Sequence, residues 1–247
     1  FEAASLSKPV FAYIVLKMVE RGEIDLDTPL IEILEKKFGK EDPRAQFGPP
    51  FPEIRDHENY RKLTARMLLS HQAGLPNEFN PPDFRFIADA GKGFDYSGEA
   101  YRFLMEVIDK VASPKSVEIL AQEEFKKIGM EHSSFIRPNT ANIALGHHSD
   151  GKTDERQHFY GIHPAGSLHT TAEDYGKFLR ACANDDFVRR EMFSPCVTTL
   201  AGDNKGKNQG VPEGILSKIA WGFGIGLQKN TDGSTTAFHW GDGSGTC

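Results

Sequence analysis

One apolar run near the start of the chain limits the possible folds more than any other feature. From Val10 to Val19 every residue except Lys17 is apolar, so a helix through this run has no polar face. A helix that is apolar on all sides belongs in a protein core. Pro9 fits only the first turn of such a helix, and Gly22 favours an end there. The run therefore predicts a buried helix around which the remaining chain packs.

Ser5 and Lys8 lie just before this run with the spacing Ser-x-x-Lys. Residues three apart share one face of a helix, so we expect the Lys8 amine to reach the Ser5 hydroxyl. A serine becomes a strong nucleophile when a neighbouring base takes its proton. Burial beside an apolar helix lowers the pKa of a lysine, because desolvation disfavours its charged form. Ser5 is therefore a candidate acyl-transfer nucleophile, at a helix start whose free N–H groups suit a developing oxyanion.

The same spacing occurs again from Ser149 to Lys152, within a polar, turn-rich stretch that has no apolar wall. We expect that copy to be a solvated loop. Taken alone, the copy at Ser5 also fits a helix N-cap serine followed by a surface lysine. The spacing by itself does not decide between these two interpretations, so evidence from other segments of the chain is needed.

The overall composition excludes several classes of function. The chain has 247 residues, of which 38% are hydrophobic, and a chain of this length can form a large core. We expect a single domain over residues 1–247. A formal net charge of −6 without a basic patch argues against a nucleic-acid partner, and no apolar stretch is long enough to span a bilayer. The three cysteines suggest neither a disulfide framework nor a zinc site: Cys182, Cys196 and Cys247.

The histidines are candidates for other roles. We expect His71 to be a structural histidine that bonds to nearby backbone, rather than a catalytic group. Five more histidines lie between residues 131 and 165 and are a conceivable metal set, but no pair has the i, i+4 spacing of a helical zinc motif: His132, His147, His148, His158 and His163. We therefore expect no metal and no cofactor.

Local patterns predict several helices followed by a small sheet. Helices are expected over residues 28–37 with Thr28 as cap, over 63–74, from the turn at Tyr96 to residue 111, over 116–127, and from Thr171 to residue 182. Two strands are expected over 219–227 and 235–241, joined by a turn at Asp232-Gly233. Because strands and helices do not alternate regularly, the pattern indicates an α+β fold with a helical region packed against an antiparallel sheet.

Five segments stand out in order along the chain: Ser5-Leu-Ser-Lys8, Leu68-Leu-Ser-His-Gln-Ala-Gly-Leu75, Tyr96-Ser-Gly98, Ala165-Gly-Ser-Leu-His-Thr-Thr171 and His239-Trp-Gly241. Together they resemble the motifs of the penicillin-recognising serine hydrolases. That family comprises class C β-lactamases, related D,D-peptidases and esterases of the same fold. The resemblance runs from the first residue to the last and implies a fold like that of the β-lactamases and penicillin-binding proteins.

The resemblance also implies roles for individual residues. Ser5 would be the nucleophile, with Lys8 and Tyr96 sharing the proton transfers of acylation and deacylation. A tyrosine near two cationic groups can be drawn toward phenolate, which suits a general base. The backbone N–H groups of Ser5 and Asp242 would form the oxyanion hole. Two aromatic residues, Trp240 and Tyr101, would either line the acyl pocket or belong to the core.

Two departures from the family pattern affect the expected substrate. Gly98 stands where an Asn is usual, which removes a side-chain amide that in β-lactamases contacts the substrate amide. His239 stands where β-lactamases have Lys, and would be a weaker and pH-dependent partner for a substrate carboxylate. Both favour hydrolysis of a small ester or amide by an esterase-like enzyme. The alternatives are a true β-lactamase or D,D-peptidase, and a non-catalytic penicillin-binding sensor, all acting on small molecules.

The resemblance further implies an incomplete domain. In the family, strands precede the Ser-x-x-Lys helix, and further strands and a helix follow the third motif. This chain contains neither the preceding strands nor the following strands and helix, so we expect it to be the central part of a longer protein. Without those additional strands the sheet would have exposed edges. Export is common in the family, but the sequence leaves the compartment open.

Overall fold

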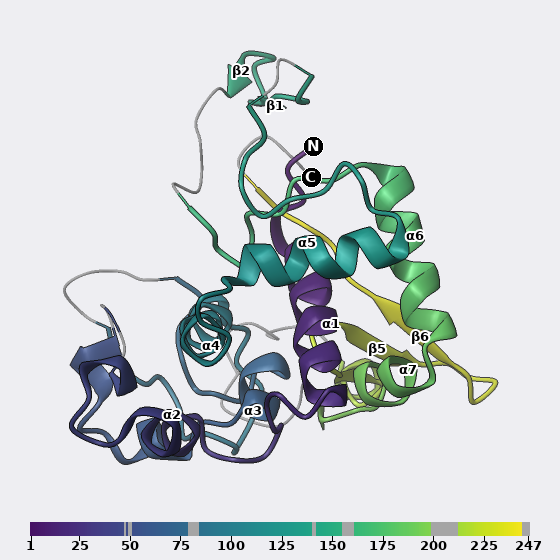
Figure 1. Cartoon of the computed structure of the whole chain (residues 1–247). Helices are drawn as coiled ribbons and strands as arrows, with labels where there is room; N and C mark the ends of the chain where they lie inside the picture. The colour runs from purple at the N-terminus through teal and green to yellow at the C-terminus, as the bar shows by residue number, and fades with distance from the viewer. Residues whose placement is uncertain are drawn as a thin grey trace.

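The computed structural model describes residues 1–46, 48, 51–78, 84–139, 142–154, 161–198 and 212–243. Within these residues the expected α+β fold is confirmed, since helices surround α1 and an antiparallel sheet flanks it (Figure 1). The α-helices are α1 Ser7–Glu20, α2 Leu30–Phe38, α3 Ala65–Leu69, α4 Gly98–Val111, α5 Val117–Ile128, α6 Ala172–Asn184, α7 Asp186–Met192 and α8 Glu213–Leu216. Single 3-10 turns are η1 Ala4–Leu6, η2 Pro43–Ala45, η3 Phe51–Ile54 and η4 Glu58–Lys62.

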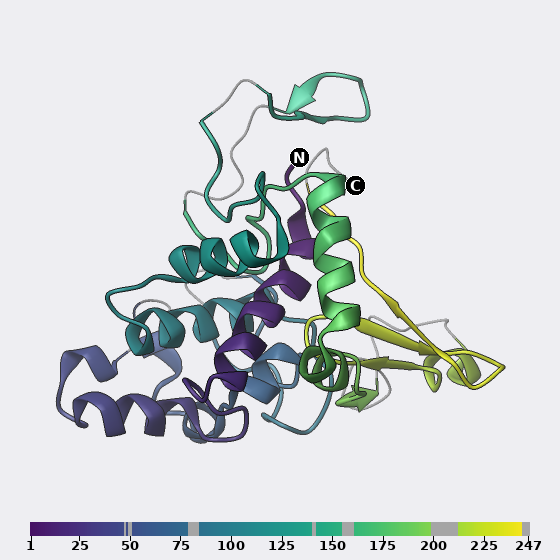
Figure 2. The same ribbon diagram turned by 45° about the vertical axis from the view of Figure 1, so that its right-hand side comes forward.

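Helix α1 is the buried element that the apolar run predicts. Its residues from Ser7 to Leu16 are buried, and so is Met18. In both views α1 runs through the middle of the molecule, between α4 and α5 on one side and α6 on the other (Figures 1 and 2). Phe11 packs against Tyr101 of α4 with ring centroids 5.8 Å apart, and Tyr13 meets Phe178 of α6 edge-on. An all-apolar helix suits this place because every face meets another element.

Helix caps decide most of the remaining boundaries. The side chains of Ser97, Ser116 and Thr171 accept a hydrogen bond from the N–H three residues on, which begins α4, α5 and α6 as expected. Gly129 ends α5 in the left-handed conformation, at φ +78°.

Two expected helix boundaries differ in the structure, and one helix was not expected. Thr28 does not cap α2. Pro29 occupies the cap position, while the Asp25 carboxylate accepts hydrogen bonds from the Thr28 backbone and hydroxyl. The helix expected over 63–74 is only α3, because the chain turns at His71, whose φ is +60°. Helix α7 has no counterpart among the predicted elements; the Asp185 side chain caps it by accepting a hydrogen bond from the Val188 N–H.

Among the described residues the main sheet has four antiparallel strands in the order β3-β4-β5-β6: β3 Val197–Thr198, β4 Ile219–Trp221, β5 Gly226–Lys229 and β6 Thr235–Phe238. The single strand expected over 219–227 is therefore wrong, since β4 and β5 are two strands paired with Trp221 opposite Gly226. Gly224 makes the tight turn between them at φ +69°, where a Cβ would lie 2.8 Å from the Lys8 carbonyl oxygen. The expected turn at Asp232-Gly233 joins β5 to β6.

A hairpin of two short strands, β1 Gly146–His147 and β2 Thr153–Asp154, projects from one end of the molecule (Figures 1 and 2). Its turn carries the second Ser-x-x-Lys copy. Ser149 and Lys152 are both exposed there, and Lys152 pairs with Asp150 at 2.9 Å. The expectation that this copy is a solvated loop is confirmed.

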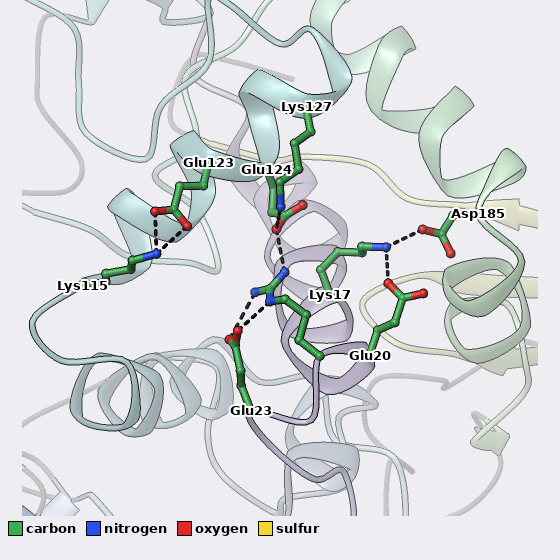
Figure 3. A network of polar contacts seen from close by, with 9 residues as sticks. Lys17, Glu20, Glu23, Lys115, Glu123, Glu124, Lys127 and Asp185 are labelled. Carbon is green, nitrogen blue, oxygen red and sulfur yellow. Dashed lines mark hydrogen bonds and ion pairs between the residues drawn. The ribbon is translucent and has the colours of Figure 1, made fainter.

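Ion pairs link the end of α1 to the helices around it. The buried Glu124 carboxylate of α5 accepts hydrogen bonds from the Arg21 guanidinium and the Lys127 amine, both at 2.8 Å. Lys17 of α1 bonds to Asp185, which lies between α6 and α7, at 2.7 Å (Figure 3). These contacts hold α1 against α5 and α7 where its apolar run ends.

Candidate active site

The Ser5 side chain lies on a short turn that precedes the buried helix. Ser5 is the middle residue of η1, and Ala4 before it has φ +46°, an unusual conformation for a residue with a Cβ. The buried Ser7 hydroxyl donates to the Ala4 carbonyl oxygen at 2.6 Å and accepts from the Leu168 N–H at 3.0 Å. Ser7 thus ties the turn to a segment far along the chain and holds Ser5 at the start of α1.

The Lys8 amine occupies the position that the spacing predicts. Its Nζ lies 3.2 Å from the Ser5 Oγ and donates to the Ala165 carbonyl oxygen at 3.0 Å. Lys8 is 2% exposed, and this burial lowers the pKa of its amine to about 7. The amine also lies over the Tyr96 ring, 4.6 Å from the centroid. Near neutral pH a large fraction of Lys8 is therefore uncharged and able to accept a proton.

Tyr96 reaches the same serine from the turn before α4. Its hydroxyl hydrogen-bonds the Ser5 side chain, and its ring stacks on His71 with centroids 4.3 Å apart. Burial raises the pKa of the Tyr96 phenol to about 12, and the hydrogen bond to Ser5 offsets only part of this rise. The expectation that nearby cations draw Tyr96 toward phenolate is therefore wrong, because desolvation of the anion outweighs them. Tyr96 is a neutral phenol in this site.

A cavity of about 350 Å³ opens beside Ser5 and Lys8. Two further predicted site residues, Gly98 and Asp242, lie in its wall; the other four are not among its lining residues: Tyr96, His239, Trp240 and Gly241. The described lining also contains residues to which the sequence assigned no catalytic or substrate-binding role, three of them acidic: Glu2, Asn77, Glu78, Glu99, His163 and Gly166. Glu99 is buried next to Gly98, 3.3 Å from Arg102 and 3.8 Å from the His163 ring. Residue spacing offers no signal for these positions, since they come from separate segments.

Gly241 brings the third motif against the serine turn. A Cβ on Gly241 would lie 2.3 Å from the Ala3 carbonyl oxygen, so only glycine lets the two backbones approach this closely. The contact places the segment after β6 beside η1, and Asp242 follows in the cavity wall. The oxyanion role of the Asp242 N–H remains a prediction.

His239 is neutral at physiological pH. Burial lowers the pKa of its imidazole to about 4, and the positive charge of Lys8 adds to this effect. Its Nδ1 lies 2.7 Å from the Trp240 carbonyl oxygen, which can only accept, so the ring proton is on Nδ1 and Nε2 carries a lone pair. The sequence predicted a pH-dependent cationic partner, but a pKa near 4 removes that charge across the neutral range.

The exposure of Tyr101, Trp240 and His71 decides between the alternative roles that the sequence left open for them. Tyr101 is 0% exposed and donates its hydroxyl hydrogen to the Leu69 carbonyl oxygen at 2.9 Å, so it is a core residue. Trp240 is 64% exposed and stacks on Phe238, so it belongs to neither the core nor the cavity wall. His71 is fully buried, and its Nδ1 accepts from the Ser97 N–H at 3.0 Å, which confirms its structural role.

Metal-ligating side chains do not gather anywhere in the part of the chain that the structure describes. His158, one of the five histidines considered above, lies outside the described residues. Among the described helices, none combines the length and apolar character that crossing a bilayer requires.

Comparisons with known proteins agree with this fold. Penicillin-binding protein 4* of Bacillus subtilis (strain 168) is 23% identical over 284 aligned residues, covering 98% of this chain and 55% of that protein. The octameric penicillin-binding protein homologue from Pyrococcus abyssi has a TM-score of 0.70 at 21% identity, over 98% of this chain and 56% of that one. A D-stereospecific amidohydrolase from Streptomyces sp. has a TM-score of 0.69 at 16% identity, over 99% of this chain and 76% of that one.

The chain spans about half the length of the curated relatives it matches. The family model described as Beta-lactamase matches residues 1–247. The fold, the Ser5–Lys8 contact and this match lead to one conclusion. The chain belongs to the beta-lactamase family of penicillin-recognising serine hydrolases.

Proposed function

We propose that the chain carries the catalytic centre of a serine hydrolase that forms an acyl-enzyme on Ser5 and hydrolyses a small ester or amide. The observation that most directly supports this is the contact of 3.2 Å between the Lys8 amine and the Ser5 hydroxyl, together with a lysine pKa of about 7. A serine needs an adjacent base to attack a carbonyl, and a desolvated lysine can be that base at neutral pH.

In acylation the Ser5 Oγ attacks the substrate carbonyl carbon while its proton passes to the neutral Lys8 amine. The tetrahedral intermediate then expels the alcohol or amine, which takes a proton from Lys8, directly or through the Tyr96 hydroxyl. In deacylation water attacks the acyl-Ser5 ester, Lys8 accepts the water proton, and the carboxylic acid leaves as Ser5 regains its hydrogen. Tyr96 acts throughout as a neutral phenol that donates a hydrogen bond, because its pKa near 12 disfavours a phenolate base.

The charge of the cavity favours an uncharged substrate. Its described wall includes four residues with carboxyl groups: Glu2, Glu78, Glu99 and Asp242. His239, which would have to attract a substrate carboxylate, is neutral at pH 7 because its pKa is lowered to about 4. A carboxylate entering this cavity would lose hydration and face like charges. Esters and amides without a carboxylate therefore fit this cavity better than penicillins or peptides, which carry a carboxylate.

The test compares hydrolysis of p-nitrophenyl butyrate and of nitrocefin by the protein at its full natural length. Ser5→Ala is expected to abolish ester turnover, whereas Ser149→Ala, in the exposed second copy of the motif, should leave it unchanged. Ester turnover that survives Ser5→Ala, or falls equally in both variants, would refute the assignment of the nucleophile.

The alternative is a true β-lactamase or D,D-peptidase, which the names of the penicillin-binding relatives favour. Fast, Ser5-dependent cleavage of nitrocefin would make it the better description. A sensor, the second alternative, would be labelled by a fluorescent penicillin in a Ser5-dependent way without releasing the label. Release of the label within minutes would exclude the sensor.

A further inference from the structure

Tyr96 lies on a segment without regular secondary structure. Residues 94–97 form neither helix nor strand and lead into α4. The Tyr96 hydroxyl nevertheless reaches the Ser5 side chain, with which it shares a hydrogen bond. A misplacement of about 1 Å in a reacting group can cost about a hundredfold in rate. The contacts that hold this segment therefore decide whether the phenol can take part in the chemistry at Ser5.

His71 contacts the segment at Tyr96 and on both sides of it. The Asp95 N–H donates to the His71 carbonyl oxygen at 2.8 Å, and the Ser97 N–H donates to the His71 Nδ1 at 3.0 Å. Between these two hydrogen bonds, the imidazole stacks on the Tyr96 ring, with centroids 4.3 Å apart and planes inclined by 28°. One residue thus holds three consecutive positions through its main chain, its ring nitrogen and its ring face.

His71 is itself held firmly in place. It is 0% exposed and turns the chain after α3 with a φ of +60°. Two residues before it, the Leu69 carbonyl oxygen accepts hydrogen bonds from the Tyr101 hydroxyl and the Gly224 N–H, both at 2.9 Å. The rings of Tyr101 and Trp221 lie 5.3 and 5.4 Å from the imidazole. Contacts from α4 and from the β4–β5 turn therefore make His71 a fixed support for the segment.

We propose that His71 is a positioning residue that holds the Tyr96 hydroxyl against Ser5, and that its Nδ1 is the atom on which this depends. The inference rests on the proposed function, because it concerns the proton-transfer partner of the same serine. Without Nδ1 the buried Ser97 N–H loses its acceptor. Leaving a buried N–H unpaired is costly, so the segment would shift toward another acceptor and carry Tyr96 with it.

The test compares two substitutions, in the protein at its full natural length, that separate the acceptor from the ring. His71→Asn places an Oδ1 where Nδ1 lies and tolerates a positive φ, but lacks the stacked ring. His71→Phe keeps a ring and lacks the acceptor. With p-nitrophenyl butyrate, His71→Phe should lower kcat at least about fivefold and change KM by less than about twofold. His71→Asn should keep kcat within about threefold of the native value.

The matched control is His147→Phe on the exposed strand β1, which should change neither kcat nor KM. Native kcat in His71→Phe would overturn the proposal. So would a fall of more than about threefold in His71→Asn, which decides the matter even if His71→Phe does not fold.

A double variant shows whether the effect passes through Tyr96. In a Tyr96→Phe protein the hydroxyl that His71 positions is gone, so adding His71→Phe should change the remaining kcat by less than about twofold. A fall as large as that in the native background would overturn the proposal, because it indicates a general structural effect.

Crystal structures of the two His71 variants separate this inference from the proposed function, because they need no catalysis. The Tyr96 hydroxyl should stay within hydrogen-bond distance of the Ser5 Oγ in His71→Asn and move by about 1 Å or more in His71→Phe. If the native protein hydrolyses no ester but the hydroxyl moves in this way, the proposed function fails and the positioning role stands. A Tyr96 hydroxyl in its native place in His71→Phe overturns the role of His71.

Discussion

The pKa of Lys8 makes the sharpest prediction about activity. The amine is 2% exposed and its pKa is lowered to about 7 by desolvation, so its base form appears as the pH rises through neutrality. About half of the molecules hold neutral Lys8 at pH 7, about a tenth at pH 6 and about a hundredth at pH 5. If neutral Lys8 is the base for Ser5, kcat/KM should rise about 50-fold from pH 5 to pH 7 and level off above about pH 8.

The assay measures kcat/KM for p-nitrophenyl butyrate between pH 5 and pH 9, because this substrate carries no group that titrates in that range. His239 does not obscure the result, since its pKa of about 4 lies below the range. Lys8→Arg keeps a cation but supplies no base, so it should abolish the rising limb together with most activity. Lys152→Arg, in the exposed copy, should leave the profile unchanged. A flat profile, or one that rises only above about pH 9, would refute Lys8 as the base.

The same pKa has a consequence for stability. An unfolded chain restores the ordinary lysine value of 10.5, so between about pH 7 and 10.5 the unfolded state binds more protons than the folded state. Buried Lys8 therefore destabilises the fold most at and below pH 7, and this cost fades as the pH rises toward 10.5. Lys8→Met should raise the urea midpoint at pH 7 and have a smaller effect at pH 10. A lower midpoint at pH 7 would show that the amine is not desolvated as the structure indicates.

Two further substitutions test contacts around the site and the central helix. Ser7→Ala leaves the buried Leu168 N–H and Ala4 oxygen without their shared partner, so it should lower the free energy of unfolding by about 1–3 kcal/mol. It should also lower kcat, and full activity would show that Ser7 does not position Ser5. Glu124→Gln removes the charge of a buried carboxylate that pairs with the partly exposed Arg21 and Lys127 and should cost about 1.5–3 kcal/mol, the range for hydrogen bonds to charged groups. The matched change Glu123→Gln affects only the exposed pair with Lys115 (Figure 3) and should lower the free energy of unfolding in urea by less than about 1 kcal/mol. Equal losses of stability in the Glu124 and Glu123 variants would contradict the stabilising role of the buried pair.

Features that depend on neighbours a few residues apart were predictable from the sequence. The apolar run from Val10 identified the buried helix, and the caps at Ser116 and Thr171 identified the starts of α5 and α6. The contact between Ser5 and Lys8 follows from a separation of three residues along a helical path. Helical periodicity and capping are local, so the residue order alone carries them.

The errors arose where tertiary contacts decide local structure. The run from Ile219 to Leu227 was expected to be one strand despite glycines at 222, 224 and 226, and it folds into a hairpin in which Gly224 turns against the backbone of Lys8. The helix expected to reach Gly74 stops at Leu69, and His71 adopts a positive φ within a cluster of rings that includes Tyr96 and Trp221. The early end of α3 has no signal within the local sequence, whereas the three glycines between Trp221 and Leu227 are a local signal for a turn.

The sequence by itself determined which residue types meet at the serine, and the family to which the chain belongs. Only the tertiary structure decided their protonation states. The Lys8 amine is buried among segments far apart in the sequence, with the Ala165 carbonyl oxygen, 157 residues away, and the Tyr96 ring beside it. Burial likewise keeps Tyr96 protonated and His239 neutral, contrary to the phenolate and the pH-dependent carboxylate partner that the family motifs led us to expect. A pKa depends on every group packed around the side chain, and those neighbours come from segments that only folding brings together.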